Sequence, residues 1–347
     1  MPIGWLASRW SDELKQTTPP NRRAAQLALL GLAAAVALGK GAKVLAQEPF
    51  PNRPIKIIVP QPPGGGFDFV ARTLADKLTS QFKQPVVVEN RTGAGTVVGT
   101  EAVAKSAPDG YTLVVGSVSN MALNPGLYPN LPYDPLKDFE VLGLAVSYSY
   151  TLLGRRGLPF ANLVDLVAYA RANPNRLTYA SAGNGSGQHV LAAALWHLAG
   201  VQLTHVPYRG AQGAYTDLLG GRVDLFFDLS STARGQVDGG LLKGLAVSGA
   251  NRNSIHPDIP TVRQTGVAPL ELESWFGLFA PARTPRSELG RLQQELGIAM
   301  KSNDVMERFE KAGGKPMALV GEEAKALVRR DVERWTKLIK DMGLKAE

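Results

Sequence analysis

A glycine-rich loop between a short apolar run and a helical pattern constrains the fold of this chain more than any other segment. The run Ile55–Val59 predicts a buried strand, and Asp68 opens a pattern in which Val70 and Leu74 share one helix face. The loop Pro62–Gly66 lies between them. Its consecutive glycines let the main chain turn N–H groups outward at a helix start, where an anion can be held without a cationic side chain. The alternative interpretation is an ordinary strand-to-helix turn that Asp68 caps.

The chain beyond this loop continues to alternate apolar strands with amphipathic helices, which is typical of an α/β architecture. Further strands are expected at Val86–Glu89, Thr112–Val115, Thr178–Ala180, Asp224–Phe227 and Gly244–Val247, and helices at Val70–Ser80, Gly99–Lys105, Leu163–Ala172, Val190–Ala199 and Ala214–Leu219. Two points where the chain crosses between lobes are expected near residues 146–152 and 274–281. We therefore expect lobe 1 to comprise residues 47–150 and 273–347, lobe 2 to comprise 151–272, and a hinge to close them around a ligand.

The first 46 residues have the features of a signal peptide. Arg22 and Arg23 precede an apolar run from Ala24 to Leu38, and small residues follow it up to Ala46. The run is about 15 residues long, whereas a membrane-spanning helix needs roughly 20. We expect export to the periplasm with cleavage after Ala46. A twin-arginine signal and a retained membrane anchor are the alternatives.

Charge and composition exclude several classes of function. The net charge is +8, but the first 46 residues hold six basic and two acidic residues, so half of that charge belongs to the signal segment. The remaining charges are scattered, which argues against nucleic-acid binding. There is no cysteine, which excludes disulfides, thiol nucleophiles and cysteine-based zinc sites. The four histidines have no metal-ligand spacing and are expected to be structural, so we expect neither metal nor cofactor.

A second glycine-rich loop joins a strand to a helix within Tyr179–His189. Ser181 and Ser186 supply hydroxyl groups there, and the main chain supplies N–H groups to an anion or amide. The alternative for Ser186 is a plain helix cap. Asp228 ends another strand, where it either faces the ligand or caps a neighbour, and Tyr208 follows a further strand toward the same expected cleft.

Neither glycine-rich segment matches a catalytic or nucleotide-binding motif. Residues 93–99 depart by one position from the dinucleotide fingerprint, and the loop around Ser181 and Ser186 lacks the first glycine of a nucleophile elbow. We therefore expect a binding protein and not an enzyme. The competing hypothesis is a periplasmic enzyme acting on a carboxylate, for which only Asp68, Asp228 or His189 could be the base.

Eight short motifs follow one another along the chain: Pro62–Asp68, Val86–Arg91, Pro108–Leu113, Leu131–Asp134, Tyr179–Ser186, His205–Tyr208, Pro257–Thr261 and Trp275–Pro281. Together they resemble the Bug family, the extracytoplasmic substrate-binding receptors of tripartite tricarboxylate transporters. The resemblance implies an α/β, two-lobe periplasmic-binding-protein fold (Venus-flytrap, type II) with a central ligand cleft. It also implies a monomer that captures a small carboxylate (organic acid, amino acid or aromatic acid) and delivers it to a membrane permease. A sensor that reports to a histidine kinase is a variation on this function.

The resemblance also carries over to individual residues. It implies ligand contacts from the glycines and Asp68 of the first loop, from the serines and glycines of the second, and from Asp228 in the cleft. The full predicted ligand-binding set is Gly64, Gly65, Gly66, Phe67, Asp68, Ser117, Ser181, Gly183, Asn184, Gly185, Ser186, Tyr208 and Asp228. Phe67 departs from the small or hydroxyl-bearing residue common in the family, which predicts a narrower pocket or a ligand with an apolar or aromatic face.

Overall fold

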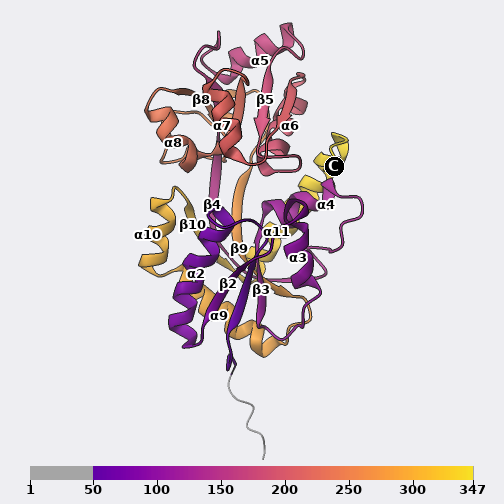
Figure 1. The fold of residues 1–347 in the computed structure, drawn as a ribbon, viewed down its shortest axis with the longest axis vertical. Coiled ribbons are helices and arrows are strands. Elements are labelled where there is room, and N and C mark those ends of the chain that lie inside the picture. Colours follow the sequence, from indigo (N-terminus) through magenta and orange to yellow (C-terminus); the bar gives the residue numbers. More distant parts are fainter. Residues whose placement is uncertain (1–49, 347) are drawn as a thin grey trace, which may run out of the picture. The chain divides into compact units, whose positions relative to one another are not determined.

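The computed structural model describes residues 50–346, in which strands and helices alternate as the sequence predicts (Figure 1). The predicted signal segment and its cleavage site lie outside the described residues. The strands are β1 (Ile55–Val59), β2 (Val86–Asn90), β3 (Thr112–Ser117), β4 (Phe139–Arg155), β5 (Thr178–Ser181), β6 (Thr204–Pro207), β7 (Leu225–Leu229), β8 (Leu242–Val247), β9 (Glu273–Pro281) and β10 (Lys315–Val320). Within residues 50–346, no helix combines the length and the apolar character needed to cross a membrane.

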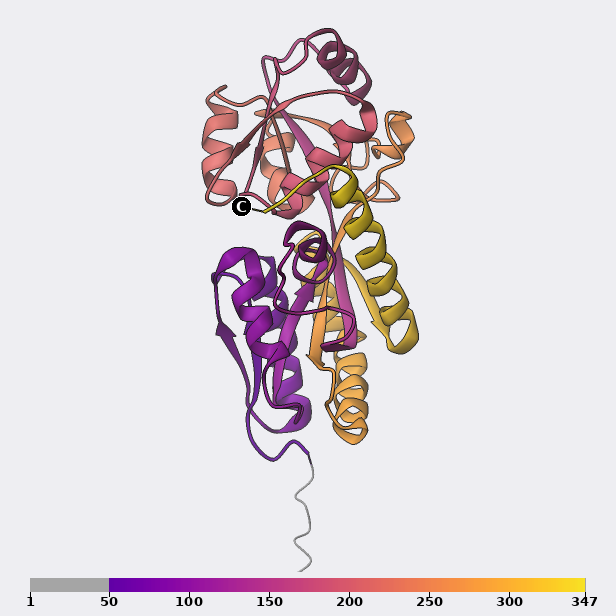
Figure 2. The ribbon, with the colours of Figure 1, turned by 90° about the vertical axis from the view of Figure 1, so that its right-hand side faces the viewer.

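The helices fall between these strands and after them. They are α2 (Gly66–Phe82), α3 (Val97–Ala104), α4 (Asn124–Leu127), α5 (Leu163–Ala172), α6 (Gly187–Ala199), α7 (Ala211–Leu219), α8 (Ser230–Asp238), α9 (Arg286–Met300), α10 (Asn303–Lys311) and α11 (Gly321–Asp341), with the π-helical turn η3 (Val118–Leu123) after β3. The last helix, α11, lies against η3, α4 and β4 (Figure 2). The last helix of the chain therefore packs on elements formed by residues 118–155.

One long strand, β4, is shared by two groups of strands (Figure 1). Its first part, up to Ser149, pairs with β9 and β10, and its last part, from Tyr150 to Arg155, pairs with β7 and β8. We call β1, β2, β3, β9, β10 and the first part of β4 the first half, with their helices. The second half is β5 to β8 with the last part of β4. The change of partners falls within the stretch 146–152 that the sequence marked as a crossing.

The strand directions turn the carboxyl ends of both halves toward each other. In the first half β1, β2 and β3 are parallel, and β3 and β4 are each antiparallel to β9, so β1 to β3 run with β4 toward the second half. In the second half β7 is antiparallel to β4 while β5 and β6 run parallel to β7, so these strands run back toward the first half. The loops after both sets of strands therefore meet at the junction, the edge at which open α/β sheets bind ligands.

Burial of apolar side chains fixes α2, the helix that carries the first loop. The predicted helix face is confirmed, because Val70 and Leu74 are 0% exposed and pack with β1 and β3. Each such side chain contributes about 1.5–3 kcal/mol by leaving water. The helix begins at Gly66, earlier than predicted, so Asp68 lies in its first turn and Gly65 occupies the cap position. The glycine run is thus part loop and part helix.

Candidate functional site

The first glycine loop ends in the exposed N-terminus of α2. Gly64 has a φ of +90°, in the left-handed region that favours glycine, and its N–H donates to Asp68 Oδ2 at 3.1 Å. The N–H groups in the first turn of a helix have no acceptor within the helix. In the described part of the chain, those of Gly66 and Phe67 have none elsewhere either. The N–H groups of Gly66, Phe67 and Asp68, and not that of Gly64, are therefore donors available to an anion.

Asp68 holds this loop together. Its carboxylate accepts from Arg72 Nε at 2.9 Å and from Asn90 Nδ2 at 3.0 Å, besides the Gly64 N–H, and its side chain is buried. The hydrogen bond from Arg72 is the main reason that the pKa of Asp68 is lowered to about 2. A carboxylate so engaged is a poor general base. Asp68 is the third residue of α2, and its carboxylate holds the loop in place by accepting the N–H of Gly64.

The aromatic ring at position 67 packs in the core of the first half. Phe67 is 3% exposed, and its ring meets that of Phe276 edge to face, with centroids 5.1 Å apart. A side chain at Gly66 would come within 3.3 Å of the same Phe276 ring, so glycine lets the helix start lie close to β9. This packing gives no support to the expectation that Phe67 presents an aromatic face to the ligand.

The second glycine loop is held by two stacked histidines. The rings of His189 and His205 are parallel, 4° apart in angle and 3.9 Å between centroids. His189 Nδ1 accepts the N–H of Gly185 at 3.1 Å, and His205 Nε2 is 2.8 Å from Ser181 Oγ, which also accepts the N–H of Gly183. Burial lowers the pKa of each histidine to about 4. Both rings are neutral at pH 7 and serve, as predicted, in structure.

These contacts leave particular donors at the start of α6. Ser186 accepts the N–H of His189 at 3.3 Å and is the helix cap, which is the alternative that the sequence offered for it. The N–H groups of Gly187 and Gln188 have no acceptor among the described residues. The second loop therefore resembles the first, in that groups near the loop accept some of its N–H groups while those at the helix start remain available.

Gly187 lies beside two residues that sequence reasoning missed. A side chain there would come within 2.7 Å of Tyr150 Oη from β4 and 3.9 Å of Ser119 Oγ from η3. Tyr150 is buried, which raises its pKa to about 12. Neither residue carries a local sequence signal, because each reaches the start of α6 only through the pairing of distant strands.

The remaining predicted residues occupy the same edges. Ser117 ends β3 and caps η3 by accepting the N–H of Ser119 at 3.1 Å. Tyr208 follows β6 and donates its hydroxyl to Asp217 at 2.7 Å, while Asn184 is exposed. Asp228 is 3% exposed near the end of β7, and burial raises its pKa to about 6.

The register along β4 gives the spacing between the ends of β3 and β7. Ser117 pairs with Phe276, which pairs in turn with Val146 of β4. Leu229, the last residue of β7, pairs with Tyr150 of β4. The step from Val146 to Tyr150 is about 13 Å at about 3.3 Å per residue. The two predicted loops follow β1 and β5, so they lie at the facing edges of the two halves.

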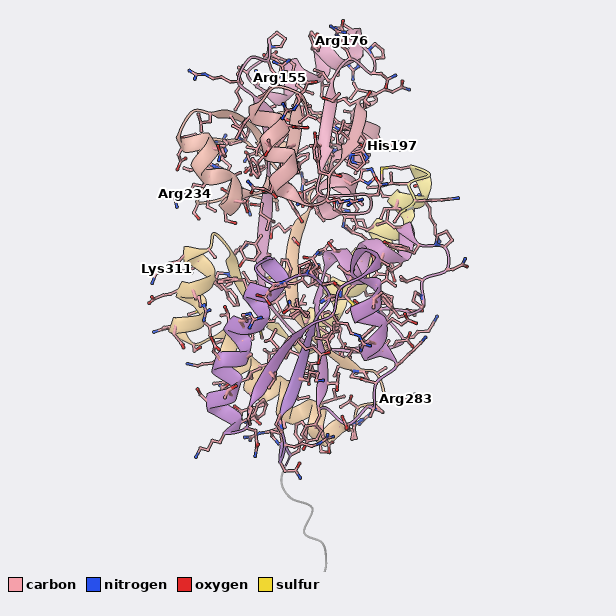
Figure 3. All side chains as sticks on the ribbon, viewed as in Figure 1. Arg155, Arg176, His197, Arg234, Arg283 and Lys311 are labelled. Carbon is pink, nitrogen blue, oxygen red and sulfur yellow. The ribbon has the colours of Figure 1, made fainter. Side chains whose placement is uncertain are left out.

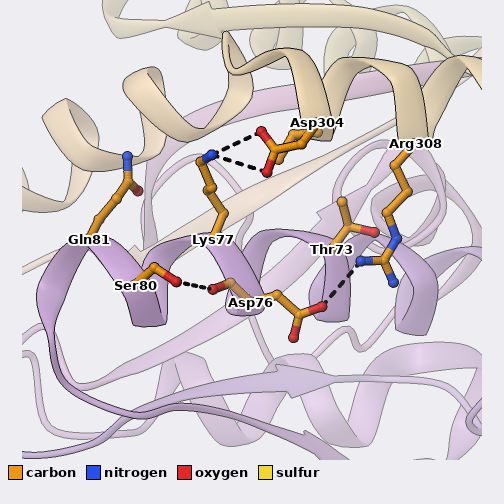
Figure 4. A pocket seen from close by; sticks show the side chains of 8 residues that line it. Thr73, Asp76, Lys77, Ser80, Gln81, Asp304 and Arg308 are labelled. Atoms are coloured by element: carbon orange, nitrogen blue, oxygen red, sulfur yellow. Dashed lines mark hydrogen bonds and ion pairs between the residues drawn. The ribbon is translucent and has the colours of Figure 1, made fainter.

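Two surface hollows lie away from these edges. One, of about 550 Å³, lies between α2 and α10, where Lys77 pairs with Asp304 at 2.8 Å and Arg308 with Asp76 at 3.1 Å (Figure 4). The other, of about 180 Å³, is lined by residues near Lys137. None of the predicted ligand-binding residues lines either hollow. The ion pairs of the first neutralise the cations that an acid would need.

Charged and metal-ligating groups do not gather elsewhere on the described surface. The residues labelled in Figure 3, such as Arg155, Arg176 and Arg283, are spread over both halves. Within residues 50–346, no group of three or more histidine, cysteine, aspartate or glutamate side chains could hold a metal ion. In both predicted loops, the groups available to an anion are thus the N–H groups at the helix start.

Known proteins match this chain along most of its length. A UPF0065 protein from the tcbD–tcbE intergenic region of Pseudomonas sp. (strain P51) is 37% identical over 86% of this chain and 88% of its own length. Protein BugT of Bordetella pertussis is 33% identical over 92% of this chain and 98% of its own. Both alignments cover more than four-fifths of this chain.

Solved structures give the fold. Periplasmic binding protein BugD has a TM-score of 0.75 and 33% identity, and covers 86% of this chain and 100% of its own. Rhodopseudomonas palustris Rpa4515 with adipate has a TM-score of 0.76 at 30% identity, covering 85% and 99%. MatC from the same organism, with bound malate, has 0.73 at 31%, covering 84% and 100%. The predicted two-lobe periplasmic-binding-protein fold is confirmed, and such a protein works in the periplasm.

The family follows from a match along most of the chain. Residues 70–344 match the model described as "Tripartite tricarboxylate transporter family receptor". This is a family of binding proteins and not of enzymes. The chain belongs to the receptor family of the tripartite tricarboxylate transporters, with the Bug proteins among its relatives.

Proposed function

We propose that this chain is a periplasmic receptor that captures a small carboxylate between its two halves and delivers it to a tripartite tricarboxylate-type permease. The observation that carries the proposal is the pair of helix N-termini, α2 and α6, at strand ends that run toward each other. The similar structures with adipate and malate support a carboxylate as the ligand class.

The two helix starts supply complementary electrostatics to an acid. Each helix N-terminus carries the equivalent of about +0.5 charge. The N–H groups of Gly66 and Phe67 on one side, and of Gly187 and Gln188 on the other, are directed donors. A hydrogen bond to a charged group contributes about 1.5–3 kcal/mol, whereas association costs about 4–15 kcal/mol, so one helix start alone holds an acid only weakly.

Capture therefore depends on both halves. A ligand favours the closed arrangement only by the difference between its interactions with the closed and open states. An acid that contacts α2 and α6 together makes its full set of hydrogen bonds only when the halves close. The same closure would present a distinct surface to the permease, and a receptor that shuttles in this way is expected to be a monomer.

Titration calorimetry against a panel of acids (succinate, malate, adipate, glutamate and benzoate) tests the proposal. We expect at least one to bind with a dissociation constant in the micromolar range or below. Gly187→Ala should weaken that binding at least about 10-fold, because its methyl group would approach Tyr150 Oη at 2.7 Å and displace the helix start.

Gly290→Ala is the matched control. Gly290 lies in α9 with nothing within 4 Å of the added methyl group, so binding should stay that of the wild type. Lys77→Ala, in the hollow between α2 and α10, should likewise leave affinity unchanged. The proposal is wrong if no acid binds and none raises the melting temperature. An affinity that depends on Lys77 and not on Gly187 would move the site to the hollow.

A further inference from the structure

One buried carboxylate near the proposed site has no cationic partner. Four carboxylates are buried within residues 50–346. Asp68, Glu295 and Asp331 each pair with an arginine, at 2.9, 3.1 and 3.3 Å. No lysine, arginine or histidine of the described residues forms an ion pair with Asp228, although it is 3% exposed. Burying a carboxylate without a cation is costly, so this exception calls for a reason.

The surroundings of Asp228 supply hydrogen bonds but no positive charge. Tyr215 Oη donates to Oδ2 at 3.0 Å, and Gln188 Nε2 lies 3.3 Å from Oδ1. The main chain at Leu229 donates a further bond. Burial is the main reason that the pKa of Asp228 is raised to about 6, so at pH 7 the group is still mostly ionised. The carboxylate thus holds a negative charge that no side chain of residues 50–346 balances.

Gln188 connects this carboxylate to the proposed acid site. Its main-chain N–H is one of the two donors left at the start of α6, and its side chain reaches Asp228. At 3.3 Å the amide contact is longer than the usual 2.7–3.2 Å of an N–H···O bond, so a better donor can replace it. An anion at the helix start and a cation at Asp228 would lie on either side of this one residue.

We propose that Asp228 binds the ammonium group of the ligand, so that the receptor selects amino acids over organic acids that lack an amine. The inference rests on the proposed function, because it assumes that the ligand's carboxylate lies at the N–H groups of Gly187 and Gln188. The ammonium group of the ligand then supplies the positive charge that the described side chains do not place beside Asp228. An acid without an amine leaves Asp228 buried and unpaired beside a second negative charge.

Matched pairs of acids that differ only in the amine test this on the wild-type protein. The pairs are succinate and aspartate, glutarate and glutamate, and adipate and 2-aminoadipate, each titrated by calorimetry at pH 7.5. We expect the amino acid to bind at least about 10-fold more tightly than its partner in the pair whose length fits. Equal or tighter binding of the acid without the amine would overturn the inference and leave the proposed function standing. No binding by any of the six would overturn both.

Asp228→Asn removes the charge and keeps the shape. It should weaken binding of the amino acid about 30-fold or more, as expected for truncating one partner of a buried charge pair. Binding of the matched plain acid should not weaken, because the substitution removes a second negative charge beside its carboxylate. Tyr215→Phe, which removes one hydrogen bond and leaves the carboxylate, is the control and should cost less than about 10-fold. A preference for the amino acid that survives Asp228→Asn would assign the selection to another group.

The pH dependence on the wild-type protein gives a second test that needs no variant. The titratable groups that face Asp228 are the phenols of Tyr150 on β4 and Tyr215 on α7, and burial raises the pKa of both, so neither ionises below pH 8. Arg234 and Asp238 of α8 pair with each other at 3.3 Å. Protonation of Asp228 should therefore weaken amino-acid binding about 10-fold between pH 7.5 and pH 5. Tighter binding of the amino acid at pH 5 would refute the inference. It would mean that protonated Asp228 donates a hydrogen bond to the ligand, as it could to an acid without an amine.

Discussion

Acid should destabilise this protein through the two stacked histidines beneath the second glycine loop. The pKa of His189 and of His205 is about 4 in the folded chain against 6.5 for a free imidazole, mainly because both rings are buried. A lowered pKa means that the unfolded state takes up protons first. The stabilising contribution is therefore complete above pH 6.5 and is lost as the pH falls toward 4. At pH 5 this difference costs about 2 kcal/mol for each ring and about 4 kcal/mol for the pair.

A double variant isolates this contribution from other titrating groups. His189→Asn places an amide oxygen where Nδ1 accepts the Gly185 N–H, and His205→Gln places an amide where Nε2 meets Ser181, so both hydrogen bonds can persist without a titrating ring. Asp228 acts in the opposite direction, since its raised pKa adds about 1 kcal/mol of stability over the same interval. That contribution is common to both proteins and cancels in their difference.

Urea denaturation at pH 7.5, 6 and 5 measures the free energy of unfolding of each protein. We expect the double variant to lose about 4 kcal/mol less than the wild type between pH 7.5 and 5. His197→Gln, which changes an exposed histidine on the same helix (Figure 3), should keep the wild-type profile. Parallel profiles for the wild type and the double variant would refute the assignment of acid sensitivity to the stacked pair.

Three further predictions concern contacts that fix the fold around the site. Asp331→Ala should lower the free energy of unfolding by about 1–3 kcal/mol in urea, because the buried indole N–H of Trp275 loses its acceptor at 2.8 Å; unchanged stability would contradict this role. Gly277→Ala should give little folded protein by circular dichroism, since its methyl group would lie 2.1 Å from a β4 carbonyl oxygen, whereas Gly290→Ala should fold normally. Asp68→Asn should lower the free energy of unfolding by about 1–2 kcal/mol at pH 7, a modest amount because the arginine partner is exposed. This loss should shrink as the pH falls from 3.8 toward 2, because the wild-type carboxylate then protonates. A difference that stays constant with pH would count against the ion pair.

The first glycine loop could be predicted from sequence because its signals are local. The apolar run Ile55–Val59 coincides with β1, and the buried face of α2 has the expected helical spacing. The exact helix start was not predictable, because glycines carry no side chain to mark where the helical turn begins. Asp68 has one hydrogen-bond partner that is near in sequence, Arg72, one helical turn further on. Its other partner, Asn90, lies on β2 and could not be predicted from local sequence.

The shared strand β4 was predicted only as a crossing point. Almost all of its 17 residues are buried on both faces, so the alternation of apolar and polar residues that marks a half-exposed strand is missing. Its pairing with β9 joins segments more than 100 residues apart in the sequence. That pairing sets the direction of β1 to β3 relative to the junction, and no local pattern encodes it. The contacts of Tyr150 with the start of α6 were beyond sequence reasoning for the same reason.

Because β4 runs without a break through both halves, its backbone fixes the spacing between the elements that pair with its two parts. Inserting one residue between Val146 and Tyr150 would not only add about 3.3 Å to the spacing but also exchange the two faces of everything beyond it, because side chains alternate along a strand. Ligand length therefore cannot be tuned by small changes in this backbone. Receptors built on this plan must adapt to longer or shorter acids through the loops and side chains at either end, and can do so while the scaffold between them stays fixed.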